Sequence, residues 1–148
     1  MIILAFRGTE QITLQDWMTD VKIRRKSGPY GKVHRGFLQG FQAVWPEIRA
    51  VIANWQTQAQ SLWLTGYSLG AALATLRMSS LGEEAKPVNG LYTFWQPRVG
   101  GKTVARIFDL DLKSRMFRFV NNNDVVTRVP TWEMGFRHFG QVIMFDAF

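Results

Sequence analysis

The chain has no cysteine, only two histidines and few acidic residues. Its 148 residues include 18 Lys and Arg against 11 Asp and Glu, which gives a formal net charge of +7. Without cysteine, disulfides and thiolate metal sites are excluded, and two histidines leave little with which to bind a metal. We therefore expect neither a metal nor another cofactor.

Long hydrophobic runs are also lacking. No stretch approaches the ~20 apolar residues that a helix needs to span a bilayer. The first six residues, MIILAF, are too short for a signal peptide, have no charged leader, and are typical of a strand. From this we expect a cytoplasmic chain, with secretion of a longer precursor as the alternative.

The composition is otherwise that of a protein with a sizeable core. Hydrophobic residues make up 47% of the chain, with six Trp and eleven Phe, and the length suits one domain over residues 1–148. The positive charge is compatible with nucleic acid or with an anionic lipid interface. Because no helix-turn-helix, RNA-binding aromatic signature or phosphate loop accompanies it, we expect no nucleic-acid partner.

The strongest local pattern is G-x-S-x-G at residues 66–70, with Ser68 at its centre. An apolar run precedes it at 62–65 and an alanine-rich stretch follows, which predicts a strand, a sharp turn and a helix. In such a turn, side chains two residues before and after the serine would collide, so glycine is needed at both positions. The turn raises the hydroxyl above the sheet and leaves the Leu69 N–H beside it. An ordinary strand-to-helix turn is the alternative.

Periodicity places further elements on both sides of this turn. Apolar runs predict strands at 2–6, 90–94, 116–120 and 141–145, and three-to-four spacing predicts a helix over 33–57 that Pro46 should bend. Further helices are expected at about 69–81, capped by Gly82, and at 102–110. We expect a helical turn at 13–18, a short strand at 20–24 and a basic loop at 24–32. Strands separated by helices predict an α/β fold with a mostly parallel sheet.

Several motifs stand in the order found in the class 3, or fungal-type, lipases of the α/β-hydrolase fold. Besides residues 66–70 they are AFRGT at 5–9, DW at 16–17, VHRGF at 33–37, YTFWQPRVG at 92–100 and NDVV at 123–126. The chain resembles this family over nearly its whole length, and most closely its bacterial members with short lids. Compared with the family, the usual N-terminal strands are lacking, so we expect either a minimal α/β-hydrolase sheet or a chain whose N-terminal part is absent. In both cases one sheet edge would be exposed.

The resemblance also implies a Ser-Asp-His triad. Ser68 would be the nucleophile, His138 the base that takes its proton, and Asp124 the acid that orients the imidazole. On spacing alone, Asp124 could equally be a turn residue, since aspartate favours turns. His138 follows Asp124 by only 138 − 124 = 14 residues, which requires a compact loop. His34 is expected to be structural and bonded to the backbone.

The remaining site residues concern the oxyanion and the substrate. The resemblance implies that backbone N–H groups of Leu69 and Thr9 hold the oxyanion. Tyr67, Trp95 and Trp17 are candidate substrate-binding residues, with core packing as the alternative for all three. Family members commonly have glycine where this chain has Trp95, so this side chain would narrow the crevice beside Ser68.

The expected activity is hydrolysis of carboxylic esters through an acyl-enzyme, as in a lipase or a carboxylesterase. The substrate would be a small-molecule or lipid ester, and the positive charge would favour association with a lipid interface. The alternative is a catalytically silent α/β-hydrolase module that acts as a binding protein. The sequence predicts neither the acyl length nor the oligomeric state.

Overall fold

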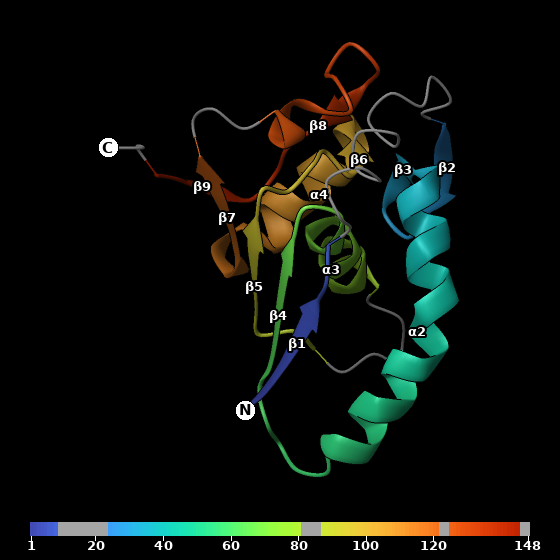
Figure 1. The fold of residues 1–148 in the computed structure, drawn as a ribbon, viewed down its shortest axis with the longest axis vertical. Coiled ribbons are helices and arrows are strands. Elements are labelled where there is room, and N and C mark those ends of the chain that lie inside the picture. The colour runs from blue at the N-terminus through green and yellow to red at the C-terminus, as the bar shows by residue number, and fades with distance from the viewer. Residues whose placement is uncertain (9–23, 81–86, 122–124, 146–148) are drawn as a thin grey trace.

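The larger of the two β-sheets in the described part of the chain is five-stranded and entirely parallel. The computed structural model describes residues 1–8, 24–80, 87–121 and 125–145. The strands are β1 (Ile2–Phe6), β4 (Leu62–Tyr67), β5 (Gly90–Phe94), β7 (Met116–Asn121) and β9 (Gln141–Phe145). Their spatial order is β1-β4-β5-β7-β9, so β1 and β9 lie at the two edges (Figure 1). The strands expected at 2–6, 90–94, 116–120 and 141–145 are confirmed.

Helices connect these strands, as the sequence predicts for an α/β fold. They are α2 (Arg35–Trp55), α3 (Leu69–Ser79) and α4 (Lys102–Asp111), with short 3-10 turns η1 (Lys113–Arg115) and η2 (Val126–Arg128). Pro46 lies within α2. α3 ends two residues earlier than expected, and its expected cap, Gly82, lies outside the described residues. The mostly parallel sheet flanked by helices confirms the predicted fold class.

A second, antiparallel sheet was not predicted. It has the order β2-β3-β6-β8 and consists of β2 (Arg25–Gly28), β3 (Gly31–His34), β6 (Gly100–Gly101) and β8 (Phe136–Arg137). β2 and β3 form a hairpin, so the basic loop expected at 24–32 is wrong. Gly31 takes a φ of 132° in this hairpin, which a side chain would resist. The helical turn expected at 13–18 and the strand expected at 20–24 lie outside the described residues, except for Arg24.

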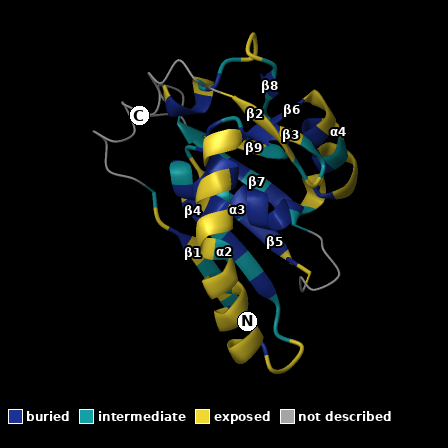
Figure 2. Ribbon diagram, turned by 90° about the vertical axis from the view of Figure 1, so that its right-hand side faces the viewer, coloured by how far each residue is buried: buried dark blue, intermediate teal, exposed yellow. Residues whose placement is uncertain are grey.

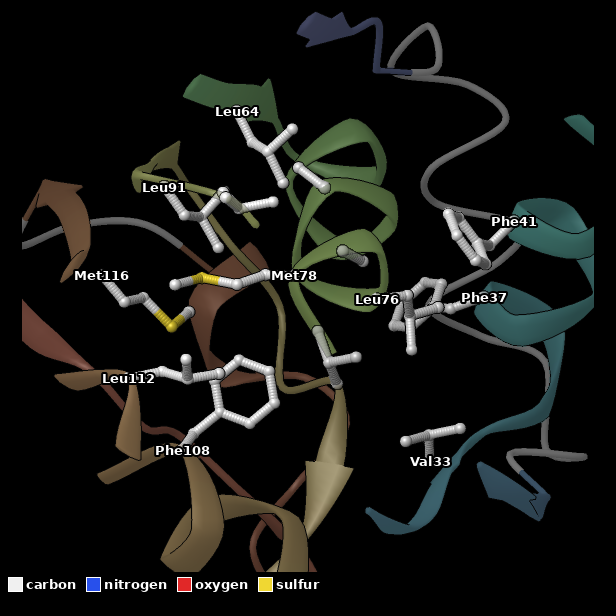
Figure 3. Close-up of a cluster of buried hydrophobic side chains, with 14 of the residues drawn as sticks. Val33, Phe37, Phe41, Leu64, Leu76, Met78, Leu91, Phe108, Leu112 and Met116 are labelled. Atoms are coloured by element: carbon white, nitrogen blue, oxygen red, sulfur yellow. The ribbon is translucent and has the colours of Figure 1, made fainter. Parts of the chain in front are cut away.

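The core lies between the parallel sheet and its helices. Leu64, Leu91 and Met116 point from neighbouring strands toward α3 and are almost completely buried (Figure 3). α3 is buried along nearly its whole length, which its alanines allow because they bring it close to the strands. α2 packs on α3 through Phe37 and Phe41 and exposes its outer face (Figure 2). Burial of these side chains at roughly 25 cal/mol per Å² drives the assembly of this layer.

The opposite face of the sheet is aromatic and partly exposed. The ring of Tyr92 stacks on Phe117 with 5.1 Å between centroids, and Phe94 stacks on Phe119 at 5.0 Å. Such pairs across neighbouring strands stabilise a sheet by roughly 0.5–1.5 kcal/mol each beyond area burial. None of the helices in the described parts of the chain is long and apolar enough to cross a membrane.

Candidate active site

The carboxyl ends of the parallel strands meet at one edge of the sheet, where open α/β sheets bind their ligands. Ser68 follows β4 directly and precedes α3, while Trp95 follows the neighbouring strand β5. Gly8 lies just beyond β1, the neighbour on the other side. Segments far apart in the sequence therefore surround Ser68.

Ser68 has a backbone conformation that few non-glycine residues adopt. Its φ is 54° and its ψ is −120°. Its N–H donates to the Phe94 carbonyl at 2.9 Å, and its own carbonyl accepts from the N–H groups of Ala71 and Ala72 at 3.0 and 3.3 Å. These hydrogen bonds hold a conformation that costs on the order of 1–3 kcal/mol, and such strain concentrates at functional sites.

The two glycines of the turn have the role that the sequence predicts. A Cβ on Gly66 would collide with the backbone of Gly70, and a Cβ on Gly70 would collide with the carbonyl of Phe6. A Cβ on Gly8 would lie 2.7 Å from the Tyr67 carbonyl oxygen. The end of β1 therefore packs directly against the turn, and only glycine permits this approach at all three positions.

The Ser68 hydroxyl lies at the amino end of α3. Ser68 is 1% exposed, and its Oγ has no hydrogen-bond partner among the described residues. Leu69 is the first residue of α3, so its N–H has no acceptor within the helix. The helix dipole adds partial positive charge at this end. A serine hydroxyl and a backbone N–H without a helical acceptor are thus adjacent, as the predicted roles of Ser68 and Leu69 require.

Three predicted site residues lie outside the described part of the chain. They are Thr9, Trp17 and Asp124. Their predicted roles as oxyanion donor, substrate contact and triad acid stay predictions.

His138 lies between β8 and β9 and has partners other than Ser68. Its Nδ1 is 3.2 Å from Nη1 of Arg118, and its Nε2 is 2.6 Å from the Thr127 carbonyl oxygen. Arginine only donates and a carbonyl only accepts, so Nδ1 is the acceptor and Nε2 carries the proton. The imidazole is therefore neutral, with both nitrogens engaged. Within the described residues, the structure does not bring His138 into the expected hydrogen bond with Ser68.

The surroundings of His138 also disfavour its protonation. Burial, then the charge of Arg118, and to a smaller extent that of Arg98, lower its pKa from 6.5 to about 3, and the Thr127 carbonyl opposes this only in part. A general base works best when its pKa lies near the operating pH. In this conformation His138 is a poor proton acceptor.

His34 is structural, as predicted. It is the N-cap of α2, where its Nδ1 accepts the Phe37 N–H at 3.3 Å. Its ring lies 4.2 Å from that of Phe37, between centroids. The capping role satisfies an N–H that the helix itself leaves unpaired.

Tyr67 and Trp95 form an aromatic wall beside the turn. Their ring centroids are 4.9 Å apart, Tyr67 is 44% exposed and Trp95 is partly buried. Trp95 has a φ of 51°, and its N–H donates to the Phe119 carbonyl at 3.1 Å. Tryptophan rarely adopts a positive φ, so this backbone conformation would suit glycine better.

The two arginines near His138, which are Arg118 and Arg98, were not identified from the sequence. Arg118 lies inside the apolar strand β7 and is only 7% exposed. A lone arginine in an apolar run signals a buried cation with specific acceptors, and this signal was available. No cluster of three or more side chains suited to a metal occurs in the described ranges.

A parallel α/β sheet with a serine at a strained strand-to-helix turn defines an α/β-hydrolase. The class 3 lipase family model matches residues 3–134. The chain belongs to the class 3 lipase family. It is 33% identical over 150 residues to a lipase of Rhizomucor miehei, covering 95% of this chain and 40% of that protein. It is 31% identical over 148 residues to secreted mono- and diacylglycerol lipase A of Penicillium cyclopium, covering 93% of this chain and 45% of that protein.

Solved structures agree with these matches. The mono- and diacylglycerol lipase of Aspergillus oryzae superposes with a TM-score of 0.83 at 27% identity, covering 94% of this chain and 52% of that one. The native propeptide complex of Rhizomucor miehei lipase superposes with a TM-score of 0.80 at 31% identity, covering 96% of this chain and 48% of that one. The chain spans 38% to 45% of the length of the curated relatives that it matches.

Proposed function

We propose that this protein hydrolyses carboxylic esters of lipids through an acyl-enzyme on Ser68. The observation that carries the proposal is the strained turn, which places the hydroxyl next to the N–H of Leu69 at the amino end of α3. Relatives named as triacylglycerol and mono- and diacylglycerol lipases support the lipid ester as substrate class. The alternative is a silent module that binds without reacting.

In this reaction Ser68 Oγ attacks the ester carbonyl, and the carbonyl oxygen becomes an oxyanion. The N–H groups of Leu69 and Thr9 would hold that oxyanion, and removing one such donor typically costs on the order of 10²–10³ in turnover. The alcohol leaves, and water then releases the acid. Asp124 would orient the base that takes the Ser68 proton. The sequence predicts His138 as this base, and His138 could act only after leaving Arg118 and Thr127.

The aromatic wall of Tyr67 and Trp95 would border the acyl chain, and Trp17 is the third predicted contact. Aromatic side chains suit an apolar chain because they bury much area at little entropic cost. The net charge of +7 would favour anionic lipid interfaces. Lipase and carboxylesterase activities differ in their response to such an interface.

Two substrates test the proposal, a dissolved short p-nitrophenyl ester and an emulsified triacylglycerol. We expect the protein to hydrolyse both, with Ser68→Ala reducing each rate by on the order of 10³-fold or more because the nucleophile is lost. Ser61→Ala is the matched control. Ser61 precedes β4 at the end opposite Ser68, where its Oγ accepts from Trp63 Nε1 at 3.2 Å.

The control variant should keep both activities. Hydrolysis of the dissolved ester alone would assign a carboxylesterase. Folded protein that hydrolyses neither ester, or a Ser68→Ala variant that retains full turnover, would contradict the proposal and favour the silent module.

A further inference from the structure

His138 bridges two elements that flank the predicted acid in the sequence. On one side is β7, which ends at Asn121, and on the other is η2, which begins at Val126. Arg118 of β7 donates through Nη1 to Nδ1 of His138, and the Nε2 of His138 donates to Thr127 of η2. A single side chain therefore connects the strand before residues 122–124 to the turn after them.

Arg118 is fixed in the position from which it contacts His138. Its Nε donates to the Phe139 carbonyl at 2.8 Å, so one guanidinium contacts both His138 and the residue after it. Burial, with a contribution from Arg98, lowers the Arg118 pKa to about 10, and nearby Asp109 opposes this shift. Arg118 is still protonated at neutral pH and presents only donors.

The turn after residue 124 has a second anchor. Arg98 donates through Nη1 to the carbonyls of Arg128 and Pro130, the latter at 3.0 Å. The Arg98 N–H also donates to the Val129 carbonyl at 3.0 Å. Because the backbone of residues 127–130 accepts from both His138 and Arg98, its position depends on these side chains.

We infer that His138 is a positioning residue, a neutral clamp between Arg118 and Thr127 that fixes the backbone beside Asp124, and that it is not the group that takes the proton from Ser68. The importance of this backbone for catalysis rests on the proposed function, in which Asp124 is the acid. The clamp itself rests on described contacts alone.

The same contacts argue against His138 as the base. A base needs a free lone pair for the serine proton, and the lone pair of Nδ1 already accepts from Arg118. After proton transfer it would be an imidazolium facing the guanidinium groups of Arg118 and Arg98, which disfavour that charge. In a Ser-His-Asp triad the second nitrogen faces a carboxylate, whereas here it faces the Thr127 carbonyl.

Three variants separate a clamp from a base. His138→Gln keeps an amide acceptor for Arg118 and a donor for Thr127 but has no basic nitrogen. His138→Ala has neither. His34→Asn is the matched control, because asparagine can also cap a helix. Whether His138 is a clamp or a base, this variant should keep the wild-type activity.

Two readouts are measured on each variant. The first is the rate at which a fluorophosphonate modifies Ser68 between pH 5 and 9. The second is hydrogen exchange of the Arg128 and Val129 amides, which donate to Val125 and Val126 within the η2 turn. Exchange reports on the clamp without requiring any catalysis.

If His138 is a clamp, the fluorophosphonate should modify Ser68 in His138→Gln at a rate within about tenfold of the wild-type rate, with an unchanged pH profile. His138→Ala should label more slowly, and its two amides should exchange about tenfold faster, as expected for the loss of about one hydrogen bond. For a base, both variants should lose on the order of 10²–10⁴ in labelling rate, and added imidazole should restore part of it.

Loss of labelling in both variants, with partial rescue by imidazole, would overturn the inference. Equal exchange rates of the two amides in the wild type and His138→Ala would also overturn it. If the wild-type protein is folded and does not label at any pH, the proposed function fails. In that case exchange still decides whether His138 clamps the turn.

Discussion

Ser68 and Trp95 both have positive φ angles, 54° and 51°, and they follow neighbouring strands. Their backbones are linked through Phe94, whose carbonyl accepts the Ser68 N–H. For an L-residue the left-handed region costs roughly 1–2 kcal/mol. Two strained residues side by side indicate that this edge of the sheet is shaped for a task other than stability.

The strain at Trp95 predicts an unusual order of stabilities. Trp95→Gly and Trp95→Ala both remove the ring, but only alanine keeps a Cβ at the positive φ. We therefore expect Trp95→Gly to be more stable than Trp95→Ala by about 1 kcal/mol in urea unfolding.

Trp45, inside α2, is the matched control position for this comparison. There the order should reverse, with the alanine variant about 1 kcal/mol more stable than the glycine variant, because glycine weakens a helix. Equal stabilities of the two Trp95 variants would show that position 95 carries no strain.

The lowered pKa of His138 predicts a dependence of stability on pH. The unfolded chain binds a proton at His138 near pH 6.5, whereas the folded protein keeps the imidazole neutral down to about pH 3. This contribution to stability is therefore complete above pH 6.5 and is lost as the pH falls. Between pH 7 and 5 we expect the loss to be about 2 kcal/mol, at ~1.4 kcal/mol per pH unit below the unfolded pKa.

Urea unfolding of the wild type and His138→Gln at both pH values measures this loss. The glutamine variant should lack it, because it has no imidazole to protonate. A loss of the same size in His138→Gln would assign the pH dependence to another group.

At the scale of elements, the turn between β4 and α3 is the feature that the others support. Gly70 lies against the carbonyl of Phe6, so a methyl group there would push β1 away from the turn. We expect Gly70→Ala to destabilise the protein by about 1–3 kcal/mol, the usual cost of overpacking, and to reduce labelling of Ser68.

Gly40 offers the control for this substitution. It lies in α2, and a Cβ there would meet only Leu73 Cδ2, at an ordinary 3.7 Å. Gly40→Ala should stabilise the protein by roughly 0.5–1 kcal/mol through its helix propensity. If both alanine variants had the same effect on the midpoint of urea unfolding, close packing at Gly70 would not explain the glycine.

The elements that the sequence predicted are those with a clear hydrophobic pattern. β5 and α4 begin at the expected residues, because β5 is a short and mostly buried apolar run and the buried residues of α4 recur with the period of a helix. The β2–β3 hairpin was missed because β2 has the sequence RKSG and is mostly exposed, so no alternation marks it. β3 also pairs with β6 and packs against α4, and both elements are far away in the sequence.

At the scale of the molecule, the order of the sequence motifs predicted the α/β fold better than it predicted the contacts in the candidate active site. The position of Ser68 depends on local backbone geometry, which a five-residue pattern encodes. The partners of His138 depend on an arginine 20 residues earlier and on a turn 11 residues earlier, which only the folded chain brings together. The order of Ser68, Asp124 and His138 along the chain was therefore not enough to predict a contact between His138 and Ser68.

The central claim is that the chain folds so as to activate Ser68 as a nucleophile. The most direct measurement is peptide mapping by mass spectrometry after a fluorophosphonate reacts with the folded protein at pH 7. Our account predicts one adduct per chain, on the peptide that contains Ser68, and none in urea-unfolded protein. An adduct on a different serine, or no adduct on folded protein, would contradict it.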